Sequence, residues 1–512
     1  MPAAPPTLPQ LVGALALATD LALGHPLEQG LGGCLVATRV AGRLGLPPTE
    51  REHLFHVSLL RHIGCTTDSA DMARRFGDER GLGAHLAPLV GASSAEYVRA
   101  TARFAVSGKA PLAAAHALAR ASVGLAGLPA LTRAMCEVAT ALARRLGLAD
   151  EVVTGLGMVA ERWDGKGLPG TARGAQIPRT VRIAQVADLV AALHDLGHDD
   201  PGAVLARRSG TAFDPEVVAA VREDLDGLRT ALDTPSRWDD VQRHAPAAAP
   251  LQDVALDAAL GVVADFVDLK SPFLAGHSCG VAALARRAAV HLRLPAADAT
   301  DVHHAGLVHD LGRVSVSTAI WDKPGRLTAG EWEAVRLHAY HTERLLGRVP
   351  YLARLGAVAA GHHERLDGSG YHRGVAPAGP AACLLAAADA YHAMREPRAH
   401  RPALGAEAAA GALRAEVVSG RLAGDAAGAV LAAAGHRPGL DARPAGLTGR
   451  EVEVLRLIAR GSSTREVARA LRITPKTADN HIQSIYGKAG VRSRAAATLF
   501  AMRHGLVDPL DA

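Results

Sequence analysis

The sequence predicts an all-α protein, and three observations lead to that fold class. Alanine and leucine fill long apolar segments that favour helix, while aromatic residues make up only 3% of the 512 residues. Alternating β-branched runs joined by Asn-Gly or Asp-Gly turns, the mark of hairpins, do not occur in the sequence. Hydrophobic residues reach 49% and charged residues 21%, a balance typical of globular domains.

Chain length and composition predict at least three domains. A chain of 512 residues is too long for one hydrophobic core. Proline, glycine and charge interrupt helical periodicity over 233–250 and 436–446, as they do in linkers. We therefore expect domains over 1–235, 250–437 and 447–512.

The first two of these segments resemble each other, which predicts an internal duplication. Leu44–Pro47 corresponds to Leu292–Pro295, and Glu161–Gly167 corresponds to Glu364–Gly370, in the same order along the chain. The spacings differ by about 45 residues, which we place as an insertion within 70–125 of the first copy. Two helical bundles in tandem are therefore expected.

Cysteine usage and the N-terminus indicate a cytoplasmic protein. The five cysteines form no C-x-x-C pair, and their odd number suits free thiols in a reducing compartment. The N-terminus lacks the basic stretch and apolar core of a signal peptide. The apolar run Leu11–Leu23 is short and contains Asp20, so we expect a buried helix and no membrane partner.

The second segment contains a series of histidine and aspartate residues that indicate a metal site. Nitrogen and oxygen ligands without cysteine suit Fe, Mn, Zn or Mg. Seven such residues exceed the need of one ion, so they could hold two divalent ions bridged by a carboxylate, which would activate water for phosphoester cleavage. The residues are His277, His309, Asp310, His338, His362, His363 and Asp389.

The order and spacing of these residues resemble the HD-GYP phosphohydrolase family over about 255–435. The resemblance rests on the motifs HDLGR, DKPGRLTAGEW, HHERLDGSGYH and AAADAYHAM. It implies that the seven residues are metal ligands, that Asp310 is catalytic and bridges two ions, and that Arg313 is catalytic and neutralises substrate phosphate. It also implies a substrate cleft lined by Arg313, Asp367, Gly368, Gly370 and Tyr371. The usual substrate of the family is cyclic di-GMP or a related cyclic dinucleotide.

The segment departs from the family pattern at four positions. Arg313 stands where the family has lysine, His372 where it has proline, and His392 where it has a second aspartate. Phe273 stands where some members place a glutamate for a third metal, so two ions are expected. These departures leave open a second interpretation, a sensor that binds a nucleotide or metal without turning it over.

The first copy lacks the ligand set. Gln29 stands opposite His277, Arg61 and His62 opposite the His-Asp pair, and Met135 opposite His338. Val159 and Ala160 stand opposite the paired histidines, and only Asp188 survives. These side chains cannot build a divalent-metal site. The copy is either a regulatory or dimerising pseudo-domain or a decayed scaffold.

The last segment predicts a helix-turn-helix. Thr448–Glu451 and Ser463–Glu466 are capping boxes that each open a helix. Thr474 caps a third helix, with Pro475 at its first position, that extends to about Tyr486. Two short helices at this spacing place the second in a major groove. The segment from Leu447 onward holds 11 Lys/Arg against 6 Asp/Glu, which equals the +5 net charge of the whole chain.

This segment is similar to the LuxR-type DNA-binding domain over its full length. The resemblance implies that Asp479, Asn480 and Gln483 read base edges, as their donors and acceptors allow. Phosphate contacts would come from Lys476, Thr477, Lys488, Arg492 and Arg494. The family's last helix, here Arg494–His504, often pairs two copies, so we expect a homodimer on double-stranded DNA. Ala478 stands where the family has valine.

Together these features predict a bacterial transcription regulator in which a metal-dependent cyclic-dinucleotide phosphodiesterase domain is coupled to sequence-specific DNA binding. The non-catalytic sensor described above is one alternative. A transcription factor whose helical body only dimerises is another.

Overall fold

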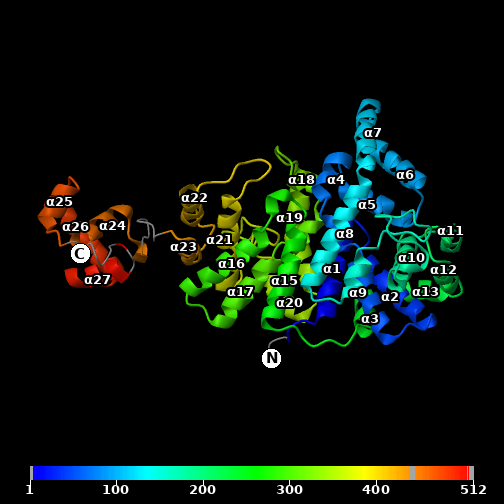
Figure 1. The fold of residues 1–512 in the computed structure, drawn as a ribbon. Coiled ribbons are helices and arrows are strands. Elements are labelled where there is room, and N and C mark those ends of the chain that lie inside the picture. The colour runs from blue at the N-terminus through cyan, green and yellow to red at the C-terminus, as the bar shows by residue number, and fades with distance from the viewer. Residues whose placement is uncertain (1–3, 437–443, 460, 504–505, 507–512) are drawn as a thin grey trace. The chain divides into compact units, whose positions relative to one another are not determined.

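The computed structural model describes residues 4–436, 444–459, 461–503 and 506 and divides into two compact units, Met1–Val430 and Leu431–Ala512. Helices build both units, and the described residues form no β-strand beyond isolated bridges. The expected all-α class is confirmed (Figure 1). No helix in the described part of the chain is both long and apolar enough to span a bilayer.

The first unit contains two bundles whose helices follow the same order, which supports the duplication. The first bundle is built on α1 (Leu8–Leu23), α2 (Gln29–Arg43), α3 (Pro48–Leu60), α8 (Leu128–Arg145), α9 (Asp150–Leu156) and α10 (Arg179–Asp195). The second repeats this order with α15 (Asp253–Asp268), α16 (His277–His291), α17 (Ala296–Val308), α19 (Ala329–Leu346), α20 (Pro350–Ala359) and α21 (Gly379–Arg395). It continues into α22 (Ala406–Val418) and α23 (Gly424–Ala433).

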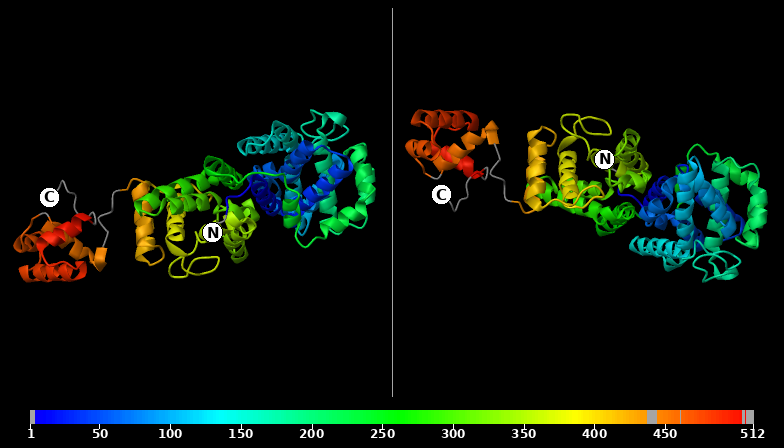
Figure 2. Two further views of the ribbon diagram at one scale, coloured as in Figure 1. Left: turned by 90° about the horizontal axis from the view of Figure 1, so that it is seen from below. Right: turned by 90° about the horizontal axis from the view of Figure 1, so that it is seen from above.

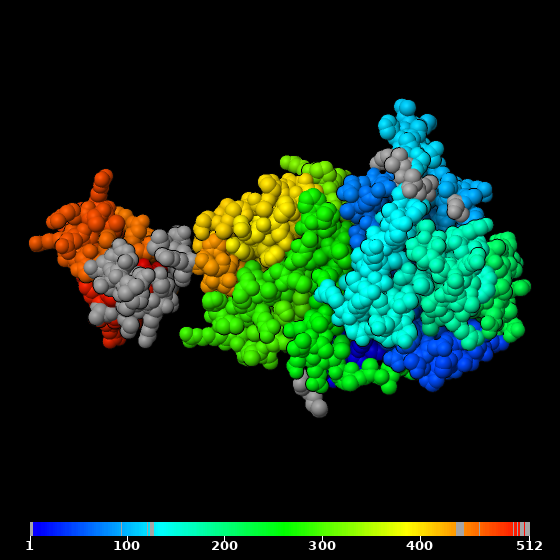
Figure 3. Space-filling view, viewed as in Figure 1, coloured from blue at the N-terminus to red at the C-terminus, as the bar shows by residue number. Residues whose placement is uncertain are grey.

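The expected insertion forms helices of its own. Four helices lie between α3 and α8: α4 (Ser69–Phe76), α5 (Glu79–Leu86), α6 (Ser94–Val106) and α7 (Pro111–Ala126). At the same place the second bundle has only α18 (Thr318–Trp321). Figure 3 shows α7, in cyan, projecting from the surface of the first unit.

The prediction of a linker over 233–250 is wrong for the middle of that segment, which forms a helix. After α11 (Pro201–Arg208), α12 (Pro215–Arg222) and α13 (Leu225–Leu232), the chain forms a further helix, α14 (Arg237–Arg243). The Ser236 hydroxyl caps it by accepting a hydrogen bond from the Asp239 amide at 3.2 Å. Trp238 is only 6% exposed and lies against Gly13 of α1. A buried tryptophan thus makes this charged, proline-flanked stretch part of the first bundle.

The two bundles pack against each other within the first unit, as both views of Figure 2 show. Helix α1 contacts α19 and the short 3-10 helix η5 (Leu311–Ser315), and α4 contacts α18. At this boundary Lys270 Nζ lies 3.2 Å from Glu79 Oε1, and both side chains are buried. Glu79 also accepts hydrogen bonds from the Ser317 hydroxyl at 2.6 Å and the Thr318 amide at 2.7 Å.

The second unit contains the helix-turn-helix: α24 (Gly449–Ala459), α25 (Thr464–Ala470), α26 (Pro475–Ala489) and α27 (Arg494–Arg503). Both expected capping boxes form, because Glu451 and Glu466 accept hydrogen bonds from the amides of Thr448 and Ser463. The third helix extends three residues beyond the expected Tyr486 and ends at Gly490, whose φ is 64°. Most of the linker expected over 436–446 lies outside the described residues.

Candidate metal centre and DNA-binding face

The seven expected ligands come from six separate places in the second bundle. His277 begins α16, His309 ends α17, and Asp310 begins η5. His338 is on α19 and Asp389 on α21, while His362 and His363 follow α20. Gly312 allows η5 to approach α19, since a Cβ there would stand 2.1 Å from the His338 carbonyl oxygen. The structure brings all seven side chains into one cluster, in which six are buried and His363 is half-buried.

The two carboxylate oxygens of Asp310 face two different sets of imidazoles. Its Oδ1 lies 3.4 Å from His338 Nε2 and 3.5 Å from His362 Nε2. Its Oδ2 lies 3.7 Å from His309 Nε2 and 3.9 Å from His277 Nε2. A carboxylate with this arrangement can contribute one oxygen to each of two cations.

Asp389 and His363 complete the two sets. Asp389 Oδ1 lies 3.3 Å from His277 Nε2 and 3.9 Å from His309 Nε2. Potential ligand atoms of His338, His362 and His363 lie within 4.8 Å of one another, as do those of His277, His309 and Asp389. The donor set therefore fits two divalent ions.

Hydrogen bonds on the outer side of the cluster orient the rings. The Nδ1 atoms of His309 and His338 donate to the carbonyl oxygens of Gly306 at 2.7 Å and Val335 at 2.5 Å. His362 Nδ1 donates to the Ala359 carbonyl oxygen at 2.5 Å. With the proton held on Nδ1, each Nε2 presents a lone pair to the cluster, as in metal-ligating histidines. His309 Nε2 is buried without a hydrogen-bond partner among the described residues.

The charge states of His309 and Asp310 also suit metal binding. Burial lowers the pKa of His309 to about 4, so its ring is neutral near pH 7. Burial alone would raise the pKa of Asp310, but the charge of Arg313 holds that pKa well below its usual range. Neutral imidazole and ionised carboxylate are the forms that coordinate cations.

Arg313 lies beside the cluster, where the resemblance places a phosphate-neutralising charge. Its Nη1 donates to Asp310 Oδ2 at 2.6 Å. Its guanidinium stacks on Trp321, with Cζ 3.7 Å from the ring centroid. The Trp321 indole N–H in turn donates to the Arg313 carbonyl oxygen at 3.3 Å. The stacking orients the guanidinium toward the carboxylate that faces both imidazole sets.

Only part of the expected substrate loop reaches the cluster. Tyr371 stacks on His363 with ring centroids 4.6 Å apart and lies 6.0 Å from His338. Asp367 is exposed, and its Oδ1 accepts hydrogen bonds from the amide and hydroxyl of Ser369 within the loop. Gly368 is also exposed and has a φ of 74°. Gly370 allows the loop to close, because a Cβ there would stand 2.4 Å from the His363 carbonyl oxygen.

Two neighbours of the site were not expected from the sequence. Glu396 Oε2 accepts a hydrogen bond from His277 Nδ1 at 2.9 Å and another from Arg398 Nη2 at 2.8 Å. Arg398 also donates to the Phe273 carbonyl oxygen at 3.2 Å. His392, noted from the sequence only as a departure, lies 3.1 Å from Glu396 Oε1 and occupies space left by Gly280. The one signal in the sequence for the contact between His392 and Glu396 was their i, i+4 spacing.

The equivalent place in the first bundle contains protein cations. Arg61 Nη1 lies 3.6 Å and His62 Nε2 3.2 Å from the same oxygen of Asp188. Burial alone would lower the pKa of His62, but the charge of Asp188 raises it to about 9. In the first bundle the Arg61 guanidinium and the His62 imidazolium therefore compensate the charge of Asp188. The corresponding carboxylate of the second bundle, Asp389, faces histidines instead.

The helix-turn-helix presents the expected reading residues on one face. Asp479, Asn480 and Gln483 are exposed on α26, whereas Ala478, Ile482 and Ile485 of the same helix are buried. Lys476 and Arg492 are exposed and Thr477 is half-buried, its hydroxyl 2.8 Å from that of Thr474. Lys488 and Arg494 are already engaged: Lys488 Nζ donates to Glu451 at 2.7 Å, and Arg494 donates to the Ser462 carbonyl oxygen.

Comparisons with known proteins agree with both parts of this description. A family model described as HD domain matches residues 261–423, and one described as bacterial regulatory proteins, luxR family, matches residues 445–501. The 3′3′-cGAMP-specific phosphodiesterase 3 of Vibrio cholerae is 30% identical over 378 residues, covering 72% of this chain and 81% of that protein.

A solved structure shares the fold of most of the chain. The crystal structure of a cyclic GMP-AMP specific phosphodiesterase of V. cholerae (V-cGAP3) aligns with a TM-score of 0.57 and 26% identity, covering 84% of this chain and 98% of that one. The response regulator protein VraR of Staphylococcus aureus is 44% identical over 61 residues, covering 12% of this chain and 29% of that protein.

Fold and site together define a metal-dependent phosphohydrolase of the HD type, joined to a LuxR-type DNA-binding domain. The chain belongs to the family of HD-GYP-type cyclic dinucleotide phosphodiesterases.

Proposed function

We propose that the second bundle hydrolyses a cyclic dinucleotide, either 3′3′-cGAMP or cyclic di-GMP, at a two-metal centre. The observation that carries this proposal is the position of Asp310, whose two oxygens face two separate sets of histidines. The ligands would be His277, His309, Asp310 and Asp389 for one ion and Asp310, His338, His362 and His363 for the other. The bound ions would lower the pKa of water and stabilise the leaving oxygen.

The remaining site residues bind and orient the substrate. The guanidinium of Arg313, stacked on Trp321, offers positive charge to a substrate phosphate. Arg398 adds a second guanidinium near the site through its contact with Glu396. Tyr371 presents a ring beside His363, where a base could stack. Hydrolysis consumes one water: its oxygen bonds to phosphorus, one P–O ester bond breaks, and the leaving ribose oxygen takes up a proton.

The catalytic proposal is tested with purified full-length protein. Metal content, and hydrolysis of 3′3′-cGAMP and cyclic di-GMP, are measured for wild type, His309→Ala and a surface control, His116→Ala. We expect two tightly bound ions, linear dinucleotide product from wild type and the control, and neither full metal loading nor product from His309→Ala. Two bound ions with no hydrolysis of any nucleotide phosphoester would contradict the proposal.

One observation favours a second candidate, a sensor that binds the nucleotide without cleaving it. Arg313 Nη1 donates to Asp310 Oδ2 at 2.6 Å, so its positive charge is partly compensated by a carboxylate before any phosphate arrives. A sensor predicts saturable binding of cyclic dinucleotide and recovery of the ligand unchanged. Product formation in the hydrolysis assay excludes it.

We further propose that the C-terminal unit binds double-stranded DNA as part of a homodimer and that the nucleotide controls this binding. The exposed Asp479, Asn480 and Gln483 on α26 support base reading, and a regulator of bacterial promoters acts in the cytoplasm. A mobility shift on a selected operator, with and without cyclic dinucleotide, tests the coupling. Unchanged affinity at saturating nucleotide would show that the two activities are independent.

A further inference from the structure

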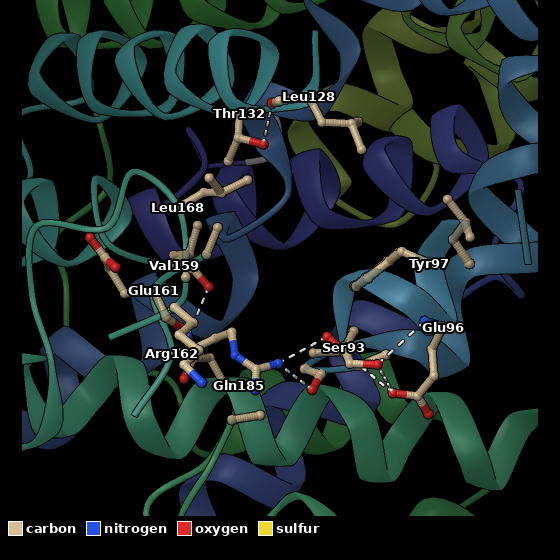
Figure 4. Close-up of a pocket in the computed structure, with 18 of the residues that line it drawn as sticks. Ser93, Glu96, Tyr97, Leu128, Thr132, Val159, Glu161, Arg162, Leu168 and Gln185 are labelled. Atoms are coloured by element: carbon tan, nitrogen blue, oxygen red, sulfur yellow. Dashed lines mark hydrogen bonds between the residues drawn. The ribbon is translucent and has the colours of Figure 1, made fainter. Parts of the chain in front are cut away.

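The first bundle contains a large cavity that the proposed catalytic site does not use. Its volume is about 1110 Å³, whereas small-molecule sites commonly measure roughly 300–1,000 Å³. Figure 4 shows Val159 and Leu168 across the open space from Tyr97. Much of the wall comes from the insertion, including Phe76 of α4 and Leu86 of α5, for which the second bundle has no counterpart. The cavity is therefore particular to the first bundle.

The cavity includes the place where the first copy has lost its metal ligands. Arg61, His62, Met135 and Val159 all line it. Arg61 is only 8% exposed. Its Nη1 donates to the Ala184 carbonyl oxygen at 2.9 Å and lies 3.6 Å from Asp188 Oδ2, while its Nε is buried with no hydrogen-bond partner among the described residues. A nearly buried guanidinium with an unused donor is a site at which an anion gains more than it would in water.

Among the other charged residues of the lining, cationic side chains are also in excess. Arg207 and Lys166 line the cavity and are exposed, which places them at its opening. Within the described ranges neither side chain has an ion-pair partner. Of the acidic residues of the lining, Asp164 pairs with Arg162, while Glu96 and Glu161 accept hydrogen bonds from Ser93 and Thr171. Cationic side chains therefore outnumber acidic ones in the lining, with Arg61 at the floor and Lys166 and Arg207 at the mouth.

The walls between these charges are apolar. Met72, Phe76, Leu82, Leu86, Leu128 and Phe213 surround the space. Tyr97 also lines it and is half-buried. A ligand with an aromatic or aliphatic body fits such a wall. Cations at both the floor and the mouth favour a ligand that carries more negative charge than one carboxylate.

We propose that this cavity is a second binding site, for an organic phosphate of nucleotide or dinucleotide size. The phosphate would meet Arg61 and the cations at the mouth, and the body would lie between Tyr97 and the apolar wall. The site does not depend on hydrolysis in the second bundle. Loss of binding at this site and loss of catalysis in the second bundle can therefore be distinguished.

Binding is measured by calorimetry on the full chain carrying His309→Ala and His362→Ala, stripped of metal with chelator, with 3′3′-cGAMP, 5′-GMP and oleate as probes. We expect one saturable site for a nucleotide and none for oleate. Adding Val159→Trp, which fills the cavity, should abolish this site, whereas the conservative Val159→Ile should retain it.

A surface variant keeps the test decisive if Val159→Trp fails to fold. Arg207→Glu reverses an exposed charge at the mouth and should weaken nucleotide binding roughly fivefold or more. Arg222→Glu reverses another exposed charge that does not line the cavity, and it should leave nucleotide binding unchanged. No nucleotide binding in the metal-free background, equal binding by Arg207→Glu and Arg222→Glu, or preference for oleate would each overturn the proposal.

Discussion

At the scale of single residues, the metal centre depends on side chains that touch its ligands as much as on the ligands. Three of its histidines donate from Nδ1 to backbone carbonyl oxygens. His277 instead donates to the side chain of Glu396 at 2.9 Å. A side-chain partner can be removed by mutation, so Glu396 offers direct access to the role of these outer contacts.

Replacing Glu396 with alanine should weaken metal binding without removing a ligand. Loss of such an outer hydrogen bond typically lowers metal affinity about 10–100-fold, because the ring is no longer held in orientation. Competition with a chromophoric chelator measures the change. Glu333→Ala, which removes an exposed glutamate paired only with Arg336, serves as control. Equal affinity in the two variants would mean that Glu396 does not position His277.

Gly370→Ala should disturb the loop that carries Tyr371. The new Cβ would lie 2.4 Å from the His363 carbonyl oxygen and 2.5 Å from the Arg365 amide nitrogen. Overpacking of this kind costs about 1–3 kcal/mol, and the movement would displace His363 as well. We expect a lower melting temperature and slower hydrolysis. Gly405→Ala is the control, because nothing lies within 4 Å of a Cβ there; identical behaviour of the two variants would contradict this account.

At the scale of elements, α26 separates its packing face from its reading face. Ala478, Ile482 and Ile485 enter the core of the second unit together with Val452, Leu455 and Ile458 of α24. The helical period then leaves Asp479, Asn480 and Gln483 exposed together. Ala478, which stands where the family has valine, is fully buried in this core.

Two substitutions on α26 should have different effects on DNA binding. Asn480→Ala should cost about 1–3 kcal/mol of discrimination between operator and mutated operator, since a paired base contact is lost. Lys476→Ala should weaken binding to all sequences and reduce the slope of log affinity against log salt by about one. Fluorescence anisotropy on both DNAs over a salt series measures each effect. Full discrimination by Asn480→Ala would place the reading face elsewhere.

At the scale of the whole molecule, the first bundle supports the loop that follows His309 and Asp310. Glu79 of α5 bonds to Ser317 and Thr318, directly after η5, and pairs with the buried Lys270. The same helix supplies Leu82 and Leu86 to the wall of the cavity. The first copy therefore has a structural role in the active unit, whether or not its cavity binds a ligand.

Glu79→Ala should destabilise the first unit strongly. It leaves the Lys270 ammonium buried without its counter-charge, a change that costs about 3–5 kcal/mol. Replacing both partners, as in Glu79→Leu with Lys270→Met, should recover most of this loss because no buried charge remains. Urea unfolding of the two variants and wild type tests this. A single variant as stable as wild type would show that water reaches Lys270.

Much of the site was predictable because the expected ligands lie in short sequence motifs. Histidines and aspartates at fixed spacing gave the ligand set, and helical period with capping residues gave the recognition helix. The helix Arg237–Arg243 was missed because proline and charge obscured one buried tryptophan. Glu396 was missed because it lies just beyond the end of α21, where the chain leaves the helix and periodicity no longer gives the direction of a side chain.

The sequence by itself determined the helical class, the duplication, the set of ligands that the resemblance implies, and the face of α26 that is free to meet DNA. These depend on local spacing, which a linear pattern records. Only the tertiary structure decided that each oxygen of Asp310 faces its own set of imidazoles, that Glu79 joins the bundles, and that the insertion encloses a cavity above Arg61. Each of these depends on segments far apart in sequence meeting at distances of a few ångströms, which packing alone sets.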